Sequence, residues 1–97
     1  MKPSEAISTH RIKILEIIAR HDGTNPRIVG GAVRDEDAED GDLYILIEPI
    51  AGKTTLLSLV KMEQEIADLL GLRVDVQTPL SLPSRIRAQI IRGSVPL

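Results

Sequence analysis

Residues 27–47 read RIVGGAVRDEDAEDGDLYILI, and this stretch decides the fold. A short β-branched run ends in the pair Gly30–Gly31, and an acidic segment separates that pair from the apolar run Leu43–Ile47. The second run, bounded by Pro49, is too apolar for a strand with one wet face. Continuous apolar runs of this length are typical of buried strands. We therefore expect two strands joined by a polar loop, the second strand being covered on both faces.

A helix is expected before the first of these strands. Apolar residues, mostly isoleucines, recur at helical spacing from about Ser4 to His21. Ser4, directly after Pro3, is a suitable N-cap, and Asp22–Gly23 is expected to end the helix because glycine adopts left-handed backbone angles easily.

Two more helices and a third strand are expected after residue 50. Thr54 or Thr55 is expected to cap a long helix that ends at Gly71. We also expect a strand over residues 72–76 and a short basic helix over residues 84–92. The order helix-strand-loop-strand-helix-strand-helix predicts a small α/β (α+β) fold with a mixed β-sheet packed with helices. The 97 residues are interpreted as a single domain.

Composition excludes several classes of protein. The chain has 12 Lys and Arg against 14 Asp and Glu, a net charge of −2, which argues against a general nucleic-acid-coating protein. With no Cys, disulfides and zinc–thiolate sites are excluded. No apolar run approaches the roughly 20 residues that span a bilayer, so we expect a cytoplasmic protein without membrane contact. The only aromatic residue is Tyr44, so the core must be aliphatic.

Three other motifs resemble a phosphate-binding loop, a calcium loop and a histidine metal site, but each lacks a residue that the site requires. Gly52-Lys53-Thr54 imitates a phosphate-binding loop but lacks the glycine five residues earlier. The acidic run from Asp35 lacks the glycine and the final glutamate of a calcium loop. His10 and His21 lack the i+4 spacing of helical metal ligands, so solvated helix residues are the simpler interpretation.

The segment from residue 29 to residue 47 carries the chemistry. A glycine pair after a strand lets backbone amides approach a phosphate closely, which assigns Gly30 and Gly31 to phosphate binding. Asp42 and Tyr44 share a face at the head of the next strand, and Asp75 lies on a third strand. Carboxylates on neighbouring strands, Asp42 and Asp75, could hold a divalent metal over that phosphate, as phosphoryl and nucleotidyl transfer require.

These residues resemble the signature of a minimal nucleotidyltransferase of the DNA polymerase beta-like superfamily. That pattern is Gly-Ser, ten residues, Asp-x-Asp, and a third Asp on a later strand. Here residues 32–41 supply the ten, Asp42 is the first carboxylate and Asp75 matches the third. The segments at residues 2–6, 69–71 and 95–97 also resemble stand-alone bacterial members, so the resemblance covers nearly the whole chain.

The resemblance implies a function and partners. Stand-alone members are commonly encoded beside a HEPN-domain protein in a toxin–antitoxin pair, in which the small transferase can be the antitoxin that moves AMP from ATP onto the toxin. It implies ATP as the nucleotide, Mg²⁺ as the metal, Asp42 and Asp75 as metal ligands, and Asp75 also as a candidate base. Homo-oligomerisation is left open. A small-molecule adenylyltransferase would need a further substrate domain.

Departures from the pattern matter as much as the matches. Gly31 stands where Ser is usual, and Asp35 where Gly follows the arginine. The run Gly30–Asp35 is nevertheless similar to the signature of tRNA CCA-adding enzymes and bacterial poly(A) polymerases, so the superfamily tolerates both changes. Arg34 matches the pattern's arginine and could face phosphate, or form a salt bridge to the acidic loop.

Tyr44 is the serious departure, because it occupies the second Asp of Asp-x-Asp. A neutral phenol is a poor ligand for a hard divalent cation. Loss of an essential electrostatic group commonly costs about 2.7–4 kcal/mol, or about 10² to 10³ in rate. Asp40 falls inside the loop, and Glu48 lies about 13 Å beyond Tyr44 at strand rise, so neither is an obvious replacement.

Two main interpretations remain open. Transfer activity is weakened or lost and the protein acts by binding a partner, or it is an active adenylyltransferase that modifies a HEPN toxin. The final helix carries Arg85, Arg87 and Arg92, which suit an acidic partner face or nucleotide phosphates, with solvated helix charges as the alternative.

Overall fold

Four strands form a mixed sheet in the order β3-β2-β1-β4. β1 (Gly23–Val29) is antiparallel to both β2 (Leu43–Pro49) and β4 (Val95–Pro96), whereas β3 (Val74–Gln77) is parallel to β2. This computed structural model describes residues 1–34 and 36–97, and of Arg34 only the backbone. The predicted α+β class with a mixed sheet is confirmed.

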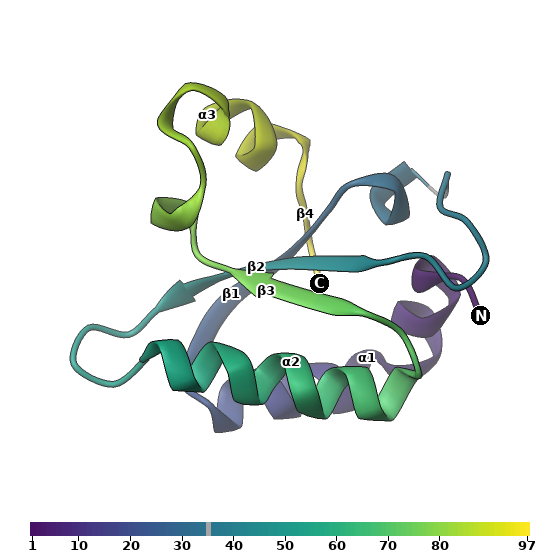
Figure 1. Ribbon diagram of the computed structural model, residues 1–97, viewed down its shortest axis with the longest axis horizontal. Coiled ribbons are helices and arrows are strands. Elements are labelled where there is room, and N and C mark those ends of the chain that lie inside the picture. The colour runs from purple at the N-terminus through teal and green to yellow at the C-terminus, as the bar shows by residue number, and fades with distance from the viewer. Residues whose placement is uncertain (35) are drawn as a thin grey trace.

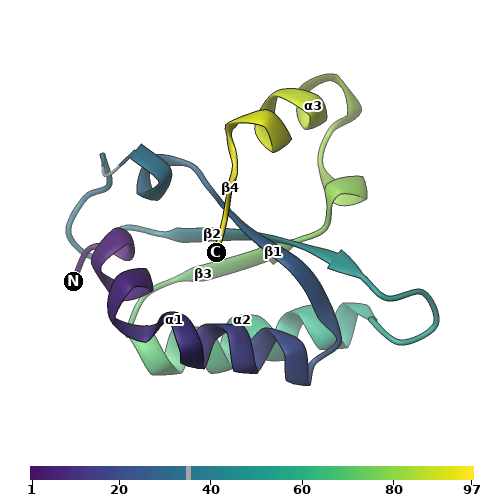
Figure 2. The same ribbon diagram turned by 180° about the vertical axis from the view of Figure 1, so that it is seen from behind.

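Helices cover the two faces of the sheet unequally. α1 (Pro3–Arg20) and α2 (Leu56–Leu70) lie side by side along one face, and α3 (Ser84–Gly93) stands on the other (Figures 1 and 2). Two short 3-10 helices, η1 (Gly31–Arg34) and η2 (Pro79–Ser81), follow β1 and β3. None of the helices in the described part of the chain is long and apolar enough to cross a membrane.

The core lies between the sheet and the α1–α2 layer, and it is aliphatic. A cluster of eleven buried residues fills this layer: Ile7, Ile14, Ile17, Ile18, Ile28, Leu43, Ile45, Ile47, Met62, Ile66 and Val76. Gly23 is buried between the layers, where an added Cβ would lie 2.7 Å from Cγ2 of Ile18. Over the described residues, the prediction of a core without aromatic rings is confirmed.

The start and end of α1 differ from the sequence prediction. The helix begins at Pro3, with Lys2 as the N-cap, so the prediction of Ser4 as the cap is wrong. Proline suits the first helical position because its missing N–H has no intrahelical partner there. At the other end Asp22, not Gly23, takes the left-handed conformation, with φ of 65°.

The limits of α2 follow its capping residues. Thr55 is the N-cap, and its side chain accepts a hydrogen bond from the backbone N–H of Ser58. Gly71 ends the helix in the left-handed conformation, with φ of 68°. Both ends were predictable because Thr and Gly favour these positions for local reasons.

β2 is covered on both faces only in part, which corrects the sequence prediction. Leu43, Ile45 and Ile47 are buried toward the α1–α2 layer, and Leu46 is buried on the opposite face. Tyr44 shares the face of Leu46 but is 43% exposed. One end of the strand therefore stays open on the α3 side of the sheet.

Candidate active site

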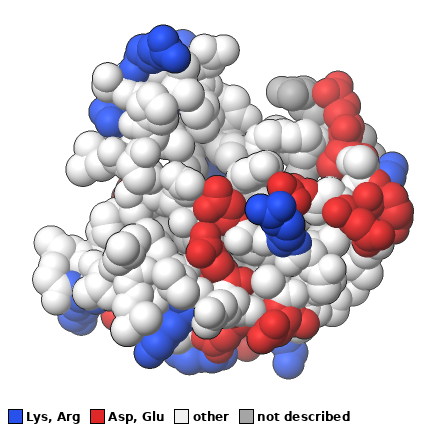
Figure 3. Space-filling model, in the orientation of Figure 1, with Lys and Arg blue, Asp and Glu red and all other residues white. Residues whose placement is uncertain are grey.

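The carboxylates expected from the sequence line one cavity at the start of β2 and β3. Because these strands are parallel and adjacent, they start at the same edge of the sheet. The cavity measures about 350 Å³ and is lined by Asp42, Tyr44, Glu63, Arg73, Val74 and Asp75. Figure 3 shows acidic side chains gathered on this side of the molecule. The structure thus places Asp42, Tyr44 and Asp75 around one cavity.

Tyr44 lies between the two aspartates. It is the register partner of Asp75 in the neighbouring strand, and its hydroxyl donates a 3.3 Å hydrogen bond to Oδ2 of Asp42. Cross-strand partners have side chains on the same face, so the phenol ring and the Asp75 carboxylate share the open face of the sheet. A neutral hydroxyl therefore stands where the nucleotidyltransferase pattern places its second carboxylate.

Glu63 is a member of the cavity that the sequence prediction missed. Its Oε2 accepts a 2.8 Å hydrogen bond from the backbone N–H of Val76, which ties α2 to β3. Burial raises the pKa of Glu63, the neighbouring Asp75 carboxyl raises it further, and the Val76 N–H only partly offsets both. The available signal was a charged residue within the apolar stripe of α2, since acidic side chains are seldom buried without partners.

Asp75 is half-buried, and its carboxylate is bound by a side chain of the same strand. Oδ2 of Asp75 accepts a 3.0 Å hydrogen bond from Nε2 of Gln77, two residues along β3. The same oxygen can also act as an acceptor for a ligand, because a carboxylate oxygen has more than one lone pair. Asp75 is thus oriented by a side chain that does not itself line the cavity.

The glycine pair adjoins the cavity through Tyr44. Gly30 has φ of 86°, and a Cβ added there would lie 3.7 Å from Cδ2 of Tyr44. Gly31 opens η1, and its added Cβ would lie 3.5 Å from Cα of Asp37, an ordinary contact. The side chain of Arg34 and all of Asp35 fall outside the described residues, so the Arg34 prediction stays a prediction.

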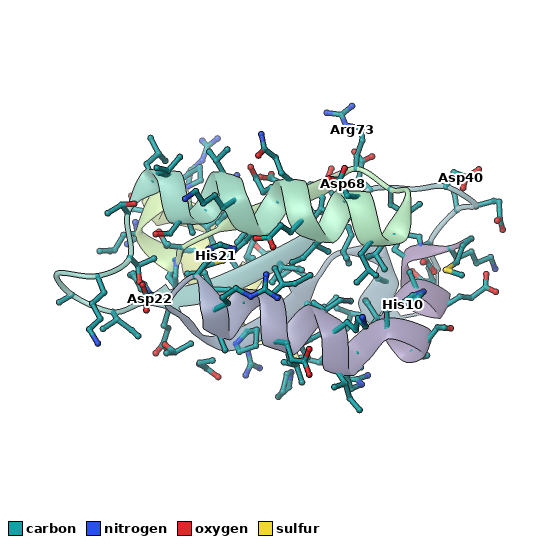
Figure 4. All side chains as sticks on the ribbon, turned by 90° about the horizontal axis from the view of Figure 1, so that it is seen from below. His10, His21, Asp22, Asp40, Asp68 and Arg73 are labelled. Atoms are coloured by element: carbon teal, nitrogen blue, oxygen red, sulfur yellow. The ribbon has the colours of Figure 1, made fainter. Side chains whose placement is uncertain are left out.

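Arg73 is a second cavity residue that the sequence prediction did not single out. It is exposed, and its side chain has no hydrogen bond or ion pair with any other described residue. Figure 4 shows Arg73 extending outward beyond α2, on the side away from α1. Among the described residues, the cavity is therefore lined by three acidic side chains and by Arg73, whose guanidinium has no described partner.

Neither alternative carboxylate reaches this cavity. Asp40 is exposed in the loop before β2, with φ of 57°, and does not line the cavity. Glu48 lines a different cavity, and its Oε1 accepts a 3.2 Å hydrogen bond from Nδ2 of Asn25. The prediction that neither residue replaces the missing second Asp agrees with this geometry.

The donor set suits a metal that is shared with a ligand. Among the described residues, no three His, Cys, Asp or Glu side chains come together as a metal site. Mg²⁺ usually takes one or two carboxylates and completes its shell with water and substrate phosphates. Asp42 and Asp75 supply two carboxylates to one cavity, which fits a Mg²⁺ ion held jointly with a nucleotide.

The two histidines noted in the sequence lie far apart, His10 within α1 and His21 at its C-cap (Figure 4). The side chain of His21 is only 17% exposed and contacts the carboxylate of Glu65, so its interpretation as a solvated residue is wrong. Thr54 stabilises the turn before α2, because its hydroxyl accepts from the N–H of Ile50 at 2.7 Å and donates to the carbonyl of Asp22 at 2.6 Å.

The basic face of α3 is narrower than expected. Arg87 bonds inward, from Nε to the carbonyl of Pro79 at 2.8 Å and from a terminal nitrogen to that of Leu82 at 3.0 Å. Arg85 and Arg92 are exposed. Arg87 therefore attaches α3 to η2 rather than adding to an open basic face.

Comparison with known proteins places this geometry in a family. A solved structure provisionally described as a minimal nucleotidyltransferase superimposes with a TM-score of 0.85 and 34% identity, over 97% of this chain and 95% of that chain. MJ0435 of Methanocaldococcus jannaschii, provisionally named a protein adenylyltransferase, is 35% identical over 83 residues, 86% of this chain and 88% of that protein. The chain belongs to the minimal nucleotidyltransferase family. No family model matches it.

Further similarities of this minimal nucleotidyltransferase agree with that assignment. The protein adenylyltransferase MntA of Thermococcus cleftensis is 37% identical over 68 residues, 70% of this chain and 68% of that protein. A toxin–antitoxin complex with AMP-PNP shares the fold, with a TM-score of 0.73 and 15% identity over 88% of this chain and 69% of that chain. The family and the nucleotidyltransferase fold inferred from the sequence are confirmed.

Proposed function

We propose that this minimal nucleotidyltransferase is the antitoxin of a toxin–antitoxin pair and binds a HEPN-domain toxin. In this proposal the transfer of AMP from ATP to the toxin is weakened or lost. The weakened transfer is inferred from the position of Tyr44, which is the register partner of Asp75 and donates a hydrogen bond to Asp42. Its phenol supplies no carboxylate between the two that remain.

The proposal gives each site residue a role. Asp42 and Asp75 hold Mg²⁺ together with the phosphates of ATP, and Gly30 and Gly31 present backbone amides to those phosphates. When bound, the ion neutralises phosphate charge and polarises the phosphoryl group. Asp75 is the candidate base for an acceptor hydroxyl. Arg34 is proposed to face phosphate.

The partner is proposed from two similar structures. A toxin–antitoxin complex with AMP-PNP and the MntA–HpeT toxin–antitoxin complex share the fold of this chain at 15% and 16% identity. MntA is also the name of the Thermococcus relative, a protein adenylyltransferase. These similarities support a toxin as the partner and an adenine nucleotide as the ligand.

The test measures AMP transfer to a co-purified HEPN partner with ATP and magnesium, by the intact mass of the partner. We expect the wild type to label the partner poorly and Tyr44→Asp to label it better, by up to about 10² to 10³ in rate, because a carboxylate returns to the site. Tyr44→Phe is the matched control. It keeps the ring, supplies no carboxylate, and should label as poorly as the wild type.

An active adenylyltransferase is the second candidate. It is favoured by the placement of Asp42 and Asp75 in one cavity, because one or two carboxylates can suffice for a nucleotide-bound Mg²⁺. Efficient labelling by the wild type that Asp42→Asn abolishes would establish this candidate and overturn the claim of weakened transfer.

A further inference from the structure

A second cavity opens beside the glycine pair, between the end of β1 and α3. It measures about 440 Å³, within the range of about 300–1,000 Å³ typical of small-molecule sites. The residues around it are Val29, Gly30, Ile86, Gln89, Ile90 and Gly93. Figure 3 shows the surface hollowed beside the lobe that α3 forms in Figure 1.

One face of α3 forms most of this cavity. Positions 86, 89, 90 and 93 follow the i, i+3, i+4, i+7 spacing of a single helix face. Ile86 and Ile90 are half-buried and offer apolar walls, while Gly93 adds no side chain. No described residue around the cavity carries a charge, so the cavity suits an uncharged part of a ligand.

Gln89 is the polar side chain of the cavity. It is exposed, and its amide makes no hydrogen bond with another described residue. An amide offers a donor and an acceptor side by side, which match N6–H and N7 of adenine; on the same edge guanine presents two acceptors.

The two cavities meet at Gly30. Gly30 lines the α3 cavity, and its missing Cβ would lie 3.7 Å from the ring of Tyr44, which lines the acidic cavity. A nucleotide with its phosphates at the glycine pair and the carboxylates can therefore extend its base toward α3 without crossing a side chain at position 30.

We propose that the α3 cavity is the adenine subsite of this protein, with Ile86 and Ile90 packing on the base and Gln89 selecting adenine over guanine. This inference rests on the proposed nucleotide binding at Asp42 and Asp75. It adds a selectivity residue and assigns a ligand-binding role to α3.

The test compares the binding of ATP, GTP and tripolyphosphate by titration calorimetry in magnesium buffer. We expect the wild type to bind ATP more tightly than GTP. Gln89→Leu should weaken ATP binding by about 5- to 10-fold, which is the lower end of the discrimination that a bidentate contact between a side-chain amide and adenine provides. Tripolyphosphate should bind both variants equally, because it lacks a base. Gln64→Leu, the same change at an exposed position of α2, is the matched control and should leave all three affinities unchanged.

The outcomes separate the inference from the proposed function. If ATP and tripolyphosphate bind the wild type but Gln89→Leu still prefers ATP to GTP as strongly as the wild type does, the adenine subsite is overturned. The proposed nucleotide site is then still supported. If the wild type binds neither compound, both are overturned. As an independent readout, adenosine should shift the methyl resonances of Ile86 and Ile90 but not of Ile12, which is 73% exposed on α1; the reverse pattern contradicts the subsite.

Discussion

At the scale of single residues, Gly30 meets a backbone constraint that few other residue types meet easily. Its φ of 86° lies in the left-handed region, whereas an added Cβ would make only an ordinary contact with the ring of Tyr44. We expect Gly30→Ala to lower the free energy of unfolding by about 1–2 kcal/mol, the cost of placing a side chain in this conformation. Urea unfolding measures the change. Gly93→Ala is the control, because its Cβ would meet no atom within 4 Å, and a loss equal to that of Gly30→Ala would contradict the argument.

At the scale of elements, the loop that leads into β2 is attached to the start of α1. Asp37 accepts hydrogen bonds from the backbone N–H of Ser4 at 2.7 Å and from its hydroxyl at 2.9 Å. Burial opposes ionisation of Asp37, but the two bonds from Ser4, together with its own backbone N–H and the charge of Lys2, hold the pKa of Asp37 below its ordinary value. The attachment fixes the loop whose last residue is Asp42, so it supports the candidate site from a distance.

This attachment predicts a pH dependence of stability. A lowered pKa in the folded state adds stability above the unfolded pKa of about 3.9, and that stability is lost as the pH falls through the folded pKa. Asp37→Asn should therefore destabilise the protein by about 1 kcal/mol at pH 7 and by less near pH 3, as urea titrations at each pH would show. Asp68→Asn, at an exposed position of α2 (Figure 4), is the control. A difference from wild type that stays constant between the two pH values would contradict the prediction.

At the scale of the whole molecule, the features that the sequence predicted are those set by local chemistry. Gly71 ends α2 because few other residues adopt its angles, and strand alternation placed Asp42 and Tyr44 on one face with Asp75 on a neighbouring strand. The charge of Glu63 within the apolar stripe of α2 was visible in the sequence, but its place beside Asp75 was not, because only tertiary packing brings α2 against β3 at that point. The exposure of Tyr44 was missed for the same reason, since it depends on which elements pack over that face of the sheet.

Two hydrogen bonds between Arg27 and Ser94 form the joint between α3 and the sheet, which also depends on tertiary packing. We expect α3 to open at a lower free energy than the core between the sheet and the α1–α2 layer. Nε of Arg27, in β1, donates to Oγ of Ser94 at 2.6 Å, and a terminal nitrogen donates to the Ser94 carbonyl at 3.0 Å. Ser94 is buried at the end of α3, whereas the main core lies on the opposite face of the sheet.

Arg27→Met keeps the apolar stem but removes both bonds, so we expect a loss of about 2 kcal/mol in unfolding free energy. Hydrogen exchange should quicken in α3 while α2 stays protected, because regions with few buried contacts open separately from the core. Arg92→Met, at an exposed position of α3, should change neither quantity, and equal effects of the two substitutions would show that the Arg27–Ser94 joint does not hold α3 in place.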